Sequence, residues 1–345
     1  MPLPAPVLAA ANPVAEASMD PSLLMWAGLG ALVLAMLLID LFVFGRGKRQ
    51  VTVRESAIWT VVWTAISLGF GALLWSWEGS QAGSEYLAGF LLERSLSLDN
   101  IFVFAILFSY FAVPVAVQPR VLSWGIMLAL VLRLGFILAG AALLDAFHIT
   151  FYAFGLLLIY TAWKLARHDD TDVEPEHNPA FRLIRKRVPM TESYDGAKLL
   201  TRVDGRKLAT PLVAVFVVVA TTDLIFAVDS IPAIFAVTTV PFIVFAANAF
   251  AMLGLRALYF LLVGVMDRFV YLSQGLSVIL AIIGAKMLLI DIWHVPIWLS
   301  LTLIVLVLAA TAVLSLRAEP KPHGPPGSDD DATAEPAEPE AVRVV

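Results

Sequence analysis

The sequence is short of two kinds of residue, cysteine and charged side chains. Cysteine is absent, which excludes disulfide scaffolding and thiolate metal ligands. Only 15% of the 345 residues are charged and 60% are hydrophobic, whereas soluble domains carry about 25% charged residues. Residues 1–20 contain no lysine or arginine, so they lack the basic segment of a secretory signal peptide. The composition indicates a membrane protein, and the modest net charge of −5 predicts no nucleic-acid partner.

Apolar runs of membrane-spanning length recur along the chain. A helix needs about 20 apolar residues to cross the hydrocarbon core of a bilayer. Two of the runs, 85–110 and 210–235, contain charged residues, and we include them as spans because their flanks are strongly apolar. We therefore expect an all-α polytopic membrane protein with about nine transmembrane helices, at 22–44, 57–76, 85–110, 120–144, 148–166, 210–235, 241–264, 270–290 and 295–317.

Basic residues are concentrated in alternate connectors. The first connector holds four of them between Arg46 and Arg54, and the long connector from Lys164 to Lys207 holds ten. Four other connectors contain none, at 76–84, 145–147, 236–240 and 291–294. Because cytoplasmic connectors carry the excess of lysine and arginine, this pattern predicts a multi-pass protein of the inner (plasma) membrane, with its N-terminus outside and its C-terminus in the cytoplasm.

The chain divides into membrane and non-membrane regions. Turn signals in the second half of the long connector favour a small hairpin there. The C-terminal segment is rich in proline and acidic residues, and we expect it to be disordered and solvated. The predicted regions are an external tail (1–21), spans one to five (22–166), a cytoplasmic connector (167–209), spans six to nine (210–317) and an acidic cytoplasmic tail (318–345).

A weak internal duplication relates spans three to five with spans six to eight. Each unit contains three spans, an odd number, so the two units run in opposite directions through the membrane. Such inverted repeats build many secondary transporters, with the substrate site at the midplane between the halves. The matches are 97–102 with 221–226, Leu132-Arg133 with Leu255-Arg256, 145–147 with 267–269, and Lys164 with Lys286.

Four acidic residues lie inside the third and sixth spans, namely Glu93, Asp99, Asp223 and Asp229. A carboxylate at the bilayer centre costs about 2.5–3.5 kcal/mol even on a lenient scale, so such residues indicate a function by default. The repeat places Asp99 and Asp223 at similar depth. Glu93 and Asp229 are each six residues away, about 9 Å towards the outside. The prediction is a central and an external tier of acids, with a helix break near Ser97 or Pro232 helping members of a tier to face one another.

Two arginines, Arg133 and Arg256, are equivalent by the repeat and also lie in mid-span. One interpretation is that they neutralise two aspartates in a purely structural core. The other is that they neutralise only part of the acidic charge, since the membrane interior then holds four acidic residues and two basic ones. We favour the second interpretation, because an excess of two negative charges matches one divalent cation. Asp40 would add a further acid if it is buried, or would lie among the headgroups if it is not.

Oxygen ligands dominate the expected site. The carboxylates could be joined by Asn100, Asn248 and the hydroxyl of Ser97. Hard oxygen ligands suit Mg²⁺, Ca²⁺ and Mn²⁺, and the residues alone leave all three open. We expect the ion to be transported, with no tightly bound cofactor.

Two segments, 93–104 and 222–235, carry a family resemblance, supported by 248–259 and 205–211. In these motifs the sequence resembles the TerC family of integral membrane proteins over roughly residues 22–317. The resemblance implies a link to Mn²⁺ export and to tellurium resistance. It also implies that the four acids of the third and sixth spans form the metal site, and none of the four positions departs from the family pattern.

The leading hypothesis is therefore a Mn²⁺ efflux carrier coupled to proton exchange, since clustered acids repel one another and take up protons readily. The alternative is a non-transporting membrane scaffold of a metal or tellurite stress-response complex, recruiting partners through 167–209 and the acidic tail. An intramembrane hydrolase is a third possibility, but the sequence contains no nucleophile–base arrangement beyond the carboxylates. We expect that the protein is not an enzyme.

Overall fold

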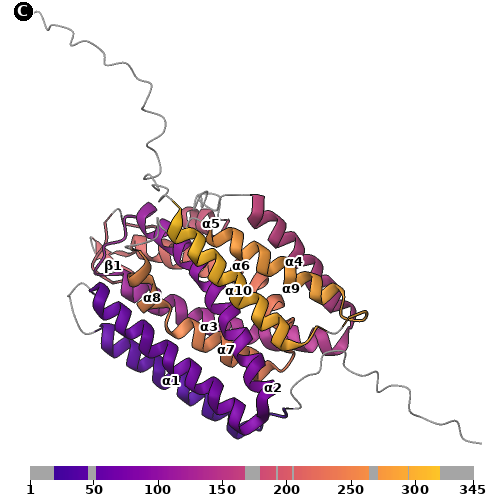
Figure 1. Cartoon of the computed structure of the whole chain (residues 1–345). Helices are drawn as coiled ribbons and strands as arrows, with labels where there is room; N and C mark the ends of the chain where they lie inside the picture. The colour runs from indigo at the N-terminus through magenta and orange to yellow at the C-terminus, as the bar shows by residue number, and fades with distance from the viewer. Residues whose placement is uncertain are drawn as a thin grey trace, which may run out of the picture.

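Ten helices and one small sheet make up the described part of the chain in a computed structural model (Figure 1). The structure describes residues 19–45, 52–167, 179–191, 193–203, 206–263, 271–293 and 295–318, so most of both expected tails lies outside it. The helices are α1 (Leu23–Gly45), α2 (Val53–Tyr110), α3 (Gln118–Ala146), α4 (Ile149–Arg167), α5 (Pro179–Arg187), α6 (Pro211–Phe235), α7 (Pro241–Leu253), α8 (Leu255–Leu262), α9 (Leu272–Leu288) and α10 (Ile297–Arg317).

Most of these helices are long and apolar enough to cross a membrane, as the sequence predicts for a polytopic protein. Within the described residues, six pass that test, namely α1, α2, α3, α4, α6 and α10. Helices α7 and α8 meet at a bend of 42° and together would form a seventh span. The count falls short of nine because α9 has only 17 residues and because α2 covers two predicted runs, 57–76 and 85–110.

Helix α2 turns back on itself at Gly79. This residue has φ 93° and ψ 173°, a conformation that is natural only for glycine. Beyond the turn, a Cβ atom on Gly83 would lie 2.7 Å from the Cβ atom of Trp75, so the two parts of the helix are in close contact. Tyr86 also donates a hydrogen bond to the main-chain oxygen of Ser67 at 3.0 Å. Helix α2 is therefore two antiparallel helices joined by a tight turn, visible at the foot of the molecule in Figure 1.

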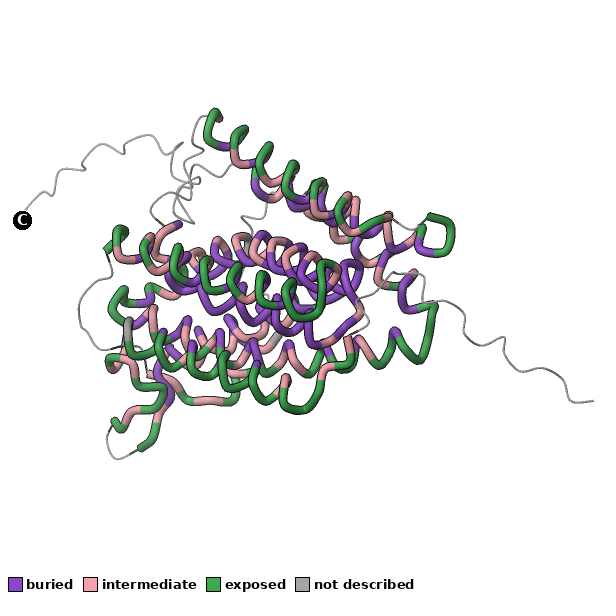
Figure 2. Tube along the Cα trace, turned by 60° about the horizontal axis from the view of Figure 1, so that its bottom comes forward, coloured by how far each residue is buried: buried purple, intermediate pink, exposed green. Residues whose placement is uncertain are grey.

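The core is built around α7, which is buried from Phe242 to Leu253. Helix α2 packs on α7, α3 packs on α6, and α4 packs on α9. At the last crossing, a Cβ atom on Gly155 would lie 3.1 Å from the oxygen of Gly284, and one on Gly284 would lie 3.0 Å from the oxygen of Gly155. Small residues allow this close backbone approach. Figure 2 shows buried residues gathered on the inner helices and exposed residues on the outer faces.

The long connector folds against one end of the helices. Strands β1 (Leu200–Val203) and β2 (Arg206–Ala209) pair antiparallel, as the turn signals predict. Tyr194 donates a hydrogen bond to the main-chain oxygen of Phe111 at the end of α2, and the ring of Phe181 in α5 lies 5.5 Å from that of Phe111. Hydrogen bonds from Lys198 and Thr201 hold the pKa of Asp195 below its usual value. The connector is thus anchored on the helices through one aromatic contact region.

Candidate metal-ion site

Arg133 of α3 is the centre of the buried polar cluster. Its side chain is only 1% exposed. One terminal nitrogen, Nη1, donates to Oε1 of Glu93 in α2 and to Oδ1 of Asn248 in α7, the latter at 3.2 Å. The other, Nη2, lies 3.7 Å from Oδ1 of Asp223 in α6. The arginine therefore draws side chains from three further helices to one point, which we call the Arg133 centre.

The Arg133 centre contains polar atoms without partners in the described protein. They include Oε2 of Glu93 and Nδ2 of Asn248, both buried. The hydroxyls of Ser97 in α2 and Ser230 in α6, the helices of Glu93 and Asp223, are also buried and without a partner among the described residues. Buried polar groups are nearly always hydrogen-bonded to protein or to water. The free carboxylate oxygen and hydroxyls are of the kind that coordinate hard cations or hold the waters around them. The described atoms therefore offer an incomplete oxygen shell next to a paired arginine.

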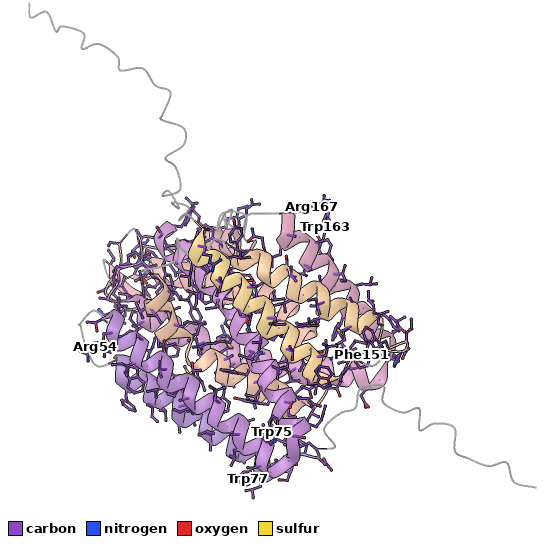
Figure 3. All side chains as sticks on the ribbon, in the orientation of Figure 1. Arg54, Trp75, Trp77, Phe151, Trp163 and Arg167 are labelled. Atoms are coloured by element: carbon purple, nitrogen blue, oxygen red, sulfur yellow. The ribbon has the colours of Figure 1, made fainter. Side chains whose placement is uncertain are left out.

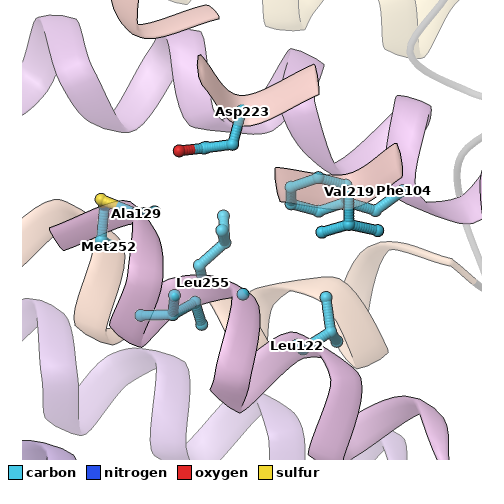
Figure 4. A pocket seen from close by; sticks show the side chains of 9 residues that line it. Phe104, Leu122, Ala129, Val219, Asp223, Met252 and Leu255 are labelled. Atoms are coloured by element: carbon cyan, nitrogen blue, oxygen red, sulfur yellow. The ribbon is translucent and has the colours of Figure 1, made fainter. Parts of the chain in front are cut away.

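A small cavity adjoins Asp223, whose carboxyl points into it (Figure 4). Its volume is about 10 Å³, close to the space that one water needs. The remaining lining is apolar, from α2, α3, α6, α7 and α8: Phe104, Leu122, Gly125, Ile126, Ala129, Val219, Met252 and Leu255. Asp223 thus faces Arg133 on one side and a narrow apolar cavity on the other. This cavity is too small for a hydrated ion.

The structure describes the positions of the other predicted ligands less completely. Asn100 is buried in α2, one turn beyond Ser97. Asp99 and Asp229 lie in helical backbone, but their side chains are outside the described part of the structure. The break expected near Ser97 or Pro232 is absent, because α2 and α6 are helical through both positions. The observed interruptions are at Gly79, which has a positive φ, and at Gly254, where a Cβ atom would lie 2.8 Å from Nη1 of Arg94.

Arg256 does not join the Arg133 centre. Its Nη2 lies 2.8 Å from Oδ2 of Asp40 in α1, and its Nη1 donates to Oγ of Ser123 in α3 at 2.6 Å. It also donates to the main-chain oxygen of Asp40. Asp40 is therefore buried and paired, not placed among the headgroups, and Arg256 is neutralised locally. We call this group the Arg256 centre.

Three charged residues were not assigned to the site by the sequence interpretation. Arg94 donates to the main-chain oxygen of Ala251 at 2.9 Å, beside the bend between α7 and α8. Glu85 is fully buried, and Lys286 lies within electrostatic range of it. The sequence could have indicated them, because all three are charged residues inside or at the edge of apolar runs. With Asp40 they bring the tally to six acids against four bases, so the excess of two negative charges persists.

Comparisons with known proteins identify the family of the chain. The model of a family described as "Integral membrane protein TerC family" matches residues 78–322. The chain is 46% identical over 308 residues to the uncharacterised membrane protein STKORF319 of Myxococcus xanthus, covering 89% of this chain and 96% of the relative. It is 44% identical over 301 residues to Alx of Escherichia coli K12, named provisionally as a membrane-bound redox modulator, with 85% and 94% covered. No solved structure matches.

Proposed function

Because the chain belongs to the TerC family of integral membrane proteins, we propose that it transports a divalent cation through the Arg133 centre. The observation that carries the proposal is the free, buried Oε2 of Glu93 beside Asp223, in a membrane interior with two excess negative charges. A divalent cation would balance that excess. The ion we propose is Mn²⁺, exported across the inner membrane in exchange for protons, with a resulting link to tellurium resistance.

An inverted repeat within a nine-span topology supports transport. In this interpretation the second part of α2, α3 and α4 form one unit, while α6, α7 with α8, and α9 form the other. The packing of α2 on α7 is then the counterpart of α3 on α6, and α4 on α9 is a contact between equivalent helices. Opposed three-span units of this kind exchange access to a central site by moving against each other.

The proposed orientation has basic ends in the cytoplasm. Arg54 and Arg167 lie towards one end of the helices, and Trp77 and Phe151 lie towards the other (Figure 3). Cytoplasmic ends carry the excess of basic residues, and tryptophan is common at membrane–water interfaces. We therefore assign the Arg54 end and the connector to the cytoplasm, with the C-terminal end of α10 on that side.

Arg133 has a definite role in the proposed mechanism. Without a cation, its charge keeps Glu93 and Asp223 from repelling each other in a medium of low dielectric constant. A cation from the cytoplasm competes with Arg133 for Glu93 and for Asp223, using the free oxygen of Glu93 as its first ligand. Opening towards the outside would then release the ion, and protons taken up by the acids would restore the empty, compact state. Proton exchange follows because like charges in one site favour protonation.

The test is Mn²⁺ flux in proteoliposomes containing the wild type or Asp223→Asn. We expect the substitution to abolish flux, because it removes one ligand and the counter-charge of Arg133. The matched control is Asp145→Asn, which neutralises an exposed acid at the end of α3 and should leave flux unchanged. Equal flux in Asp223→Asn and the wild type would place the pathway elsewhere.

A scaffold remains the second candidate, favoured by the connector's exposed basic helix. The last turn of α5 contains Arg185, Lys186 and Arg187, all exposed. The name of the E. coli relative also suggests redox modulation, but this chain has no cysteine through which a thiol-based process could run. Replacing Lys186 and Arg187 by serine separates the candidates. A carrier keeps its Mn²⁺ flux, whereas a scaffold loses its effect on metal or tellurite tolerance.

A further inference from the structure

A second, larger cavity lies at the opposite end of the helices from the connector. Its volume is about 290 Å³. It is enclosed by the turn region of α2, the start of α4, the end of α6, the end of α9 and the segment before α10. Most of its lining is apolar and aromatic, including Trp293 and Trp298, and its charged or amide side chains are Lys286 and Gln81. The proposed orientation makes this an external cavity.

A built polar group closes the inner side of the external cavity. Glu85 is fully buried and accepts two hydrogen bonds, one at each carboxylate oxygen. Gln81, which lines the cavity, donates to Oε1 at 2.7 Å, and Thr238 donates to Oε2 at 2.6 Å. Lys286, also in the lining, interacts electrostatically with the same carboxylate. The carboxylate is therefore fixed in place by Gln81 and Thr238, within electrostatic range of an amine that also lines the cavity.

Glu85 stands between the external cavity and the Arg133 centre. It precedes Glu93 by eight residues in α2, a rise of about 12 Å and a rotation of about 80° between the two side chains. Gly89 lies midway, and a Cβ atom there would be 3.1 Å from Cδ1 of Ile234 and 3.3 Å from Cβ of Ala247. One tightly packed layer thus separates the two acidic residues. Any cation moving from Glu93 to the cavity along this face of α2 meets Glu85 next.

We propose that Glu85 is an outer station for the divalent cation and that the positive charge of Lys286, in the cavity wall, weakens the hold of this station on the cation. The proposal rests on the function proposed above. The Lys286 ammonium competes electrostatically with the cation for the carboxylate. Its charge therefore favours release of the cation into the cavity. Lys286 therefore prevents the outer station from retaining the ion or recapturing it from outside.

Cysteine labelling tests the outer station without reference to transport. The chain contains no cysteine, so Val295→Cys, in the cavity lining, provides a single reactive thiol. Its rate of modification by a membrane-impermeant cationic thiosulfonate is measured with and without external Mn²⁺. We expect Mn²⁺ to slow the reaction, and Glu85→Gln to abolish that protection. Lys286→Met should give protection at an about tenfold lower Mn²⁺ concentration, because the competing charge is gone.

Two controls separate charge from structure. Lys286→Arg keeps the positive charge and should keep the wild-type Mn²⁺ dependence. Glu78→Gln removes an exposed carboxylate seven residues earlier in α2 and should leave protection intact. Protection that is absent from a Val295→Cys protein, or that survives Glu85→Gln, would overturn the proposal.

Flux measurements on the same variants distinguish this proposal from the function on which it rests. Glu85→Gln should stop Mn²⁺ flux by leaving the Lys286 charge in the path, and Glu85→Gln with Lys286→Met should restore part of it. Protection without wild-type flux would refute transport while supporting the outer station. Wild-type flux without Glu85-dependent protection would refute the outer station and leave transport standing.

Discussion

Arg133 and Arg256 occupy matching places in the proposed repeat, but their surroundings differ. Arg133 is shared by Glu93, Asp223 and Asn248, and one oxygen of Glu93 is left without a partner. Arg256 is held by the carboxylate and the main-chain oxygen of Asp40 and by Ser123. At the Arg256 centre one base faces one acid, and Oδ1 of Asp40 is also without a hydrogen-bond partner in the described part of the chain. At the Arg133 centre one base faces two acids, Glu93 and Asp223. The difference between the two centres is therefore their balance of charge, and only the Arg133 centre is a candidate binding site.

The source of the partners explains the difference. Asp40 comes from α1, which lies outside the proposed repeat, and it ties α1 to α8 and α3. Glu93 and Asp223 come from the helices that the repeat pairs, α2 and α6. Helix α1, which lies outside the proposed repeat, therefore neutralises Arg256, while Arg133 interacts with the central acids. It follows that the two centres should respond differently to the same kind of substitution.

The largest expected difference concerns stability. Removing one partner of a buried ion pair costs about 3–5 kcal/mol, because the other charge is left uncompensated. Asp40→Leu and Arg256→Met should each destabilise the protein by that amount in thermal unfolding in detergent. The double substitution should return close to wild-type stability, since an apolar pair of similar volume replaces the ion pair.

The Arg133 centre should not be repaired in this way. In Glu93→Leu with Arg133→Met, Asp223 loses its counter-ion, so the double variant should stay destabilised. Full recovery in this double variant would show that the centre is a simple ion pair like that of Arg256, and would remove the distinction between them.

A smaller effect is expected from the neutral side chains that support each arginine. Asn248→Ala removes an amide from the proposed ligand set and should weaken Mn²⁺ affinity about tenfold, the scale typical for groups that orient metal ligands. Ser123→Ala removes the hydroxyl that accepts from Arg256 and should leave Mn²⁺ affinity unchanged. Calorimetric titration of the purified variants measures both. Equal losses of Mn²⁺ affinity in the two variants would mean that the hydroxyl and the amide contribute only to folding.

The helices were largely predictable because lipid allows few alternatives. The run 120–144 lies within α3, and α10 covers the run 295–317 from Ile297 onwards, since apolar runs of this length satisfy their backbones only as helices. The connector predicted at 76–84 contains the turn at Gly79. How tight this turn is was not predicted, because it depends on how Trp75 and Gly83 pack after the chain folds back. The helix break expected near Pro232 was wrong, because α6 continues to Phe235.

The residue types of the site were easier to predict than their pairing. Buried charge is costly in lipid, which singled out Glu93, Asp223 and Arg133 from the sequence. Nothing in the sequence says that Asp40 pairs with Arg256, because the two are brought together only by the packing of α1 beside α8 and α3. Glu85 and Lys286 were passed over because they lie near the ends of apolar runs, where charges are common.

The most direct test of the account is Mn²⁺ binding to the purified protein, followed by electron paramagnetic resonance. Three forms are compared: the wild type, Glu93→Gln, and Asp40→Leu with Arg256→Met. We expect the double variant to bind Mn²⁺ as the wild type does, and Glu93→Gln to lose affinity by about 100-fold. Loss of binding in the double variant with retention in Glu93→Gln would move the cation site to the Arg256 centre and contradict the account.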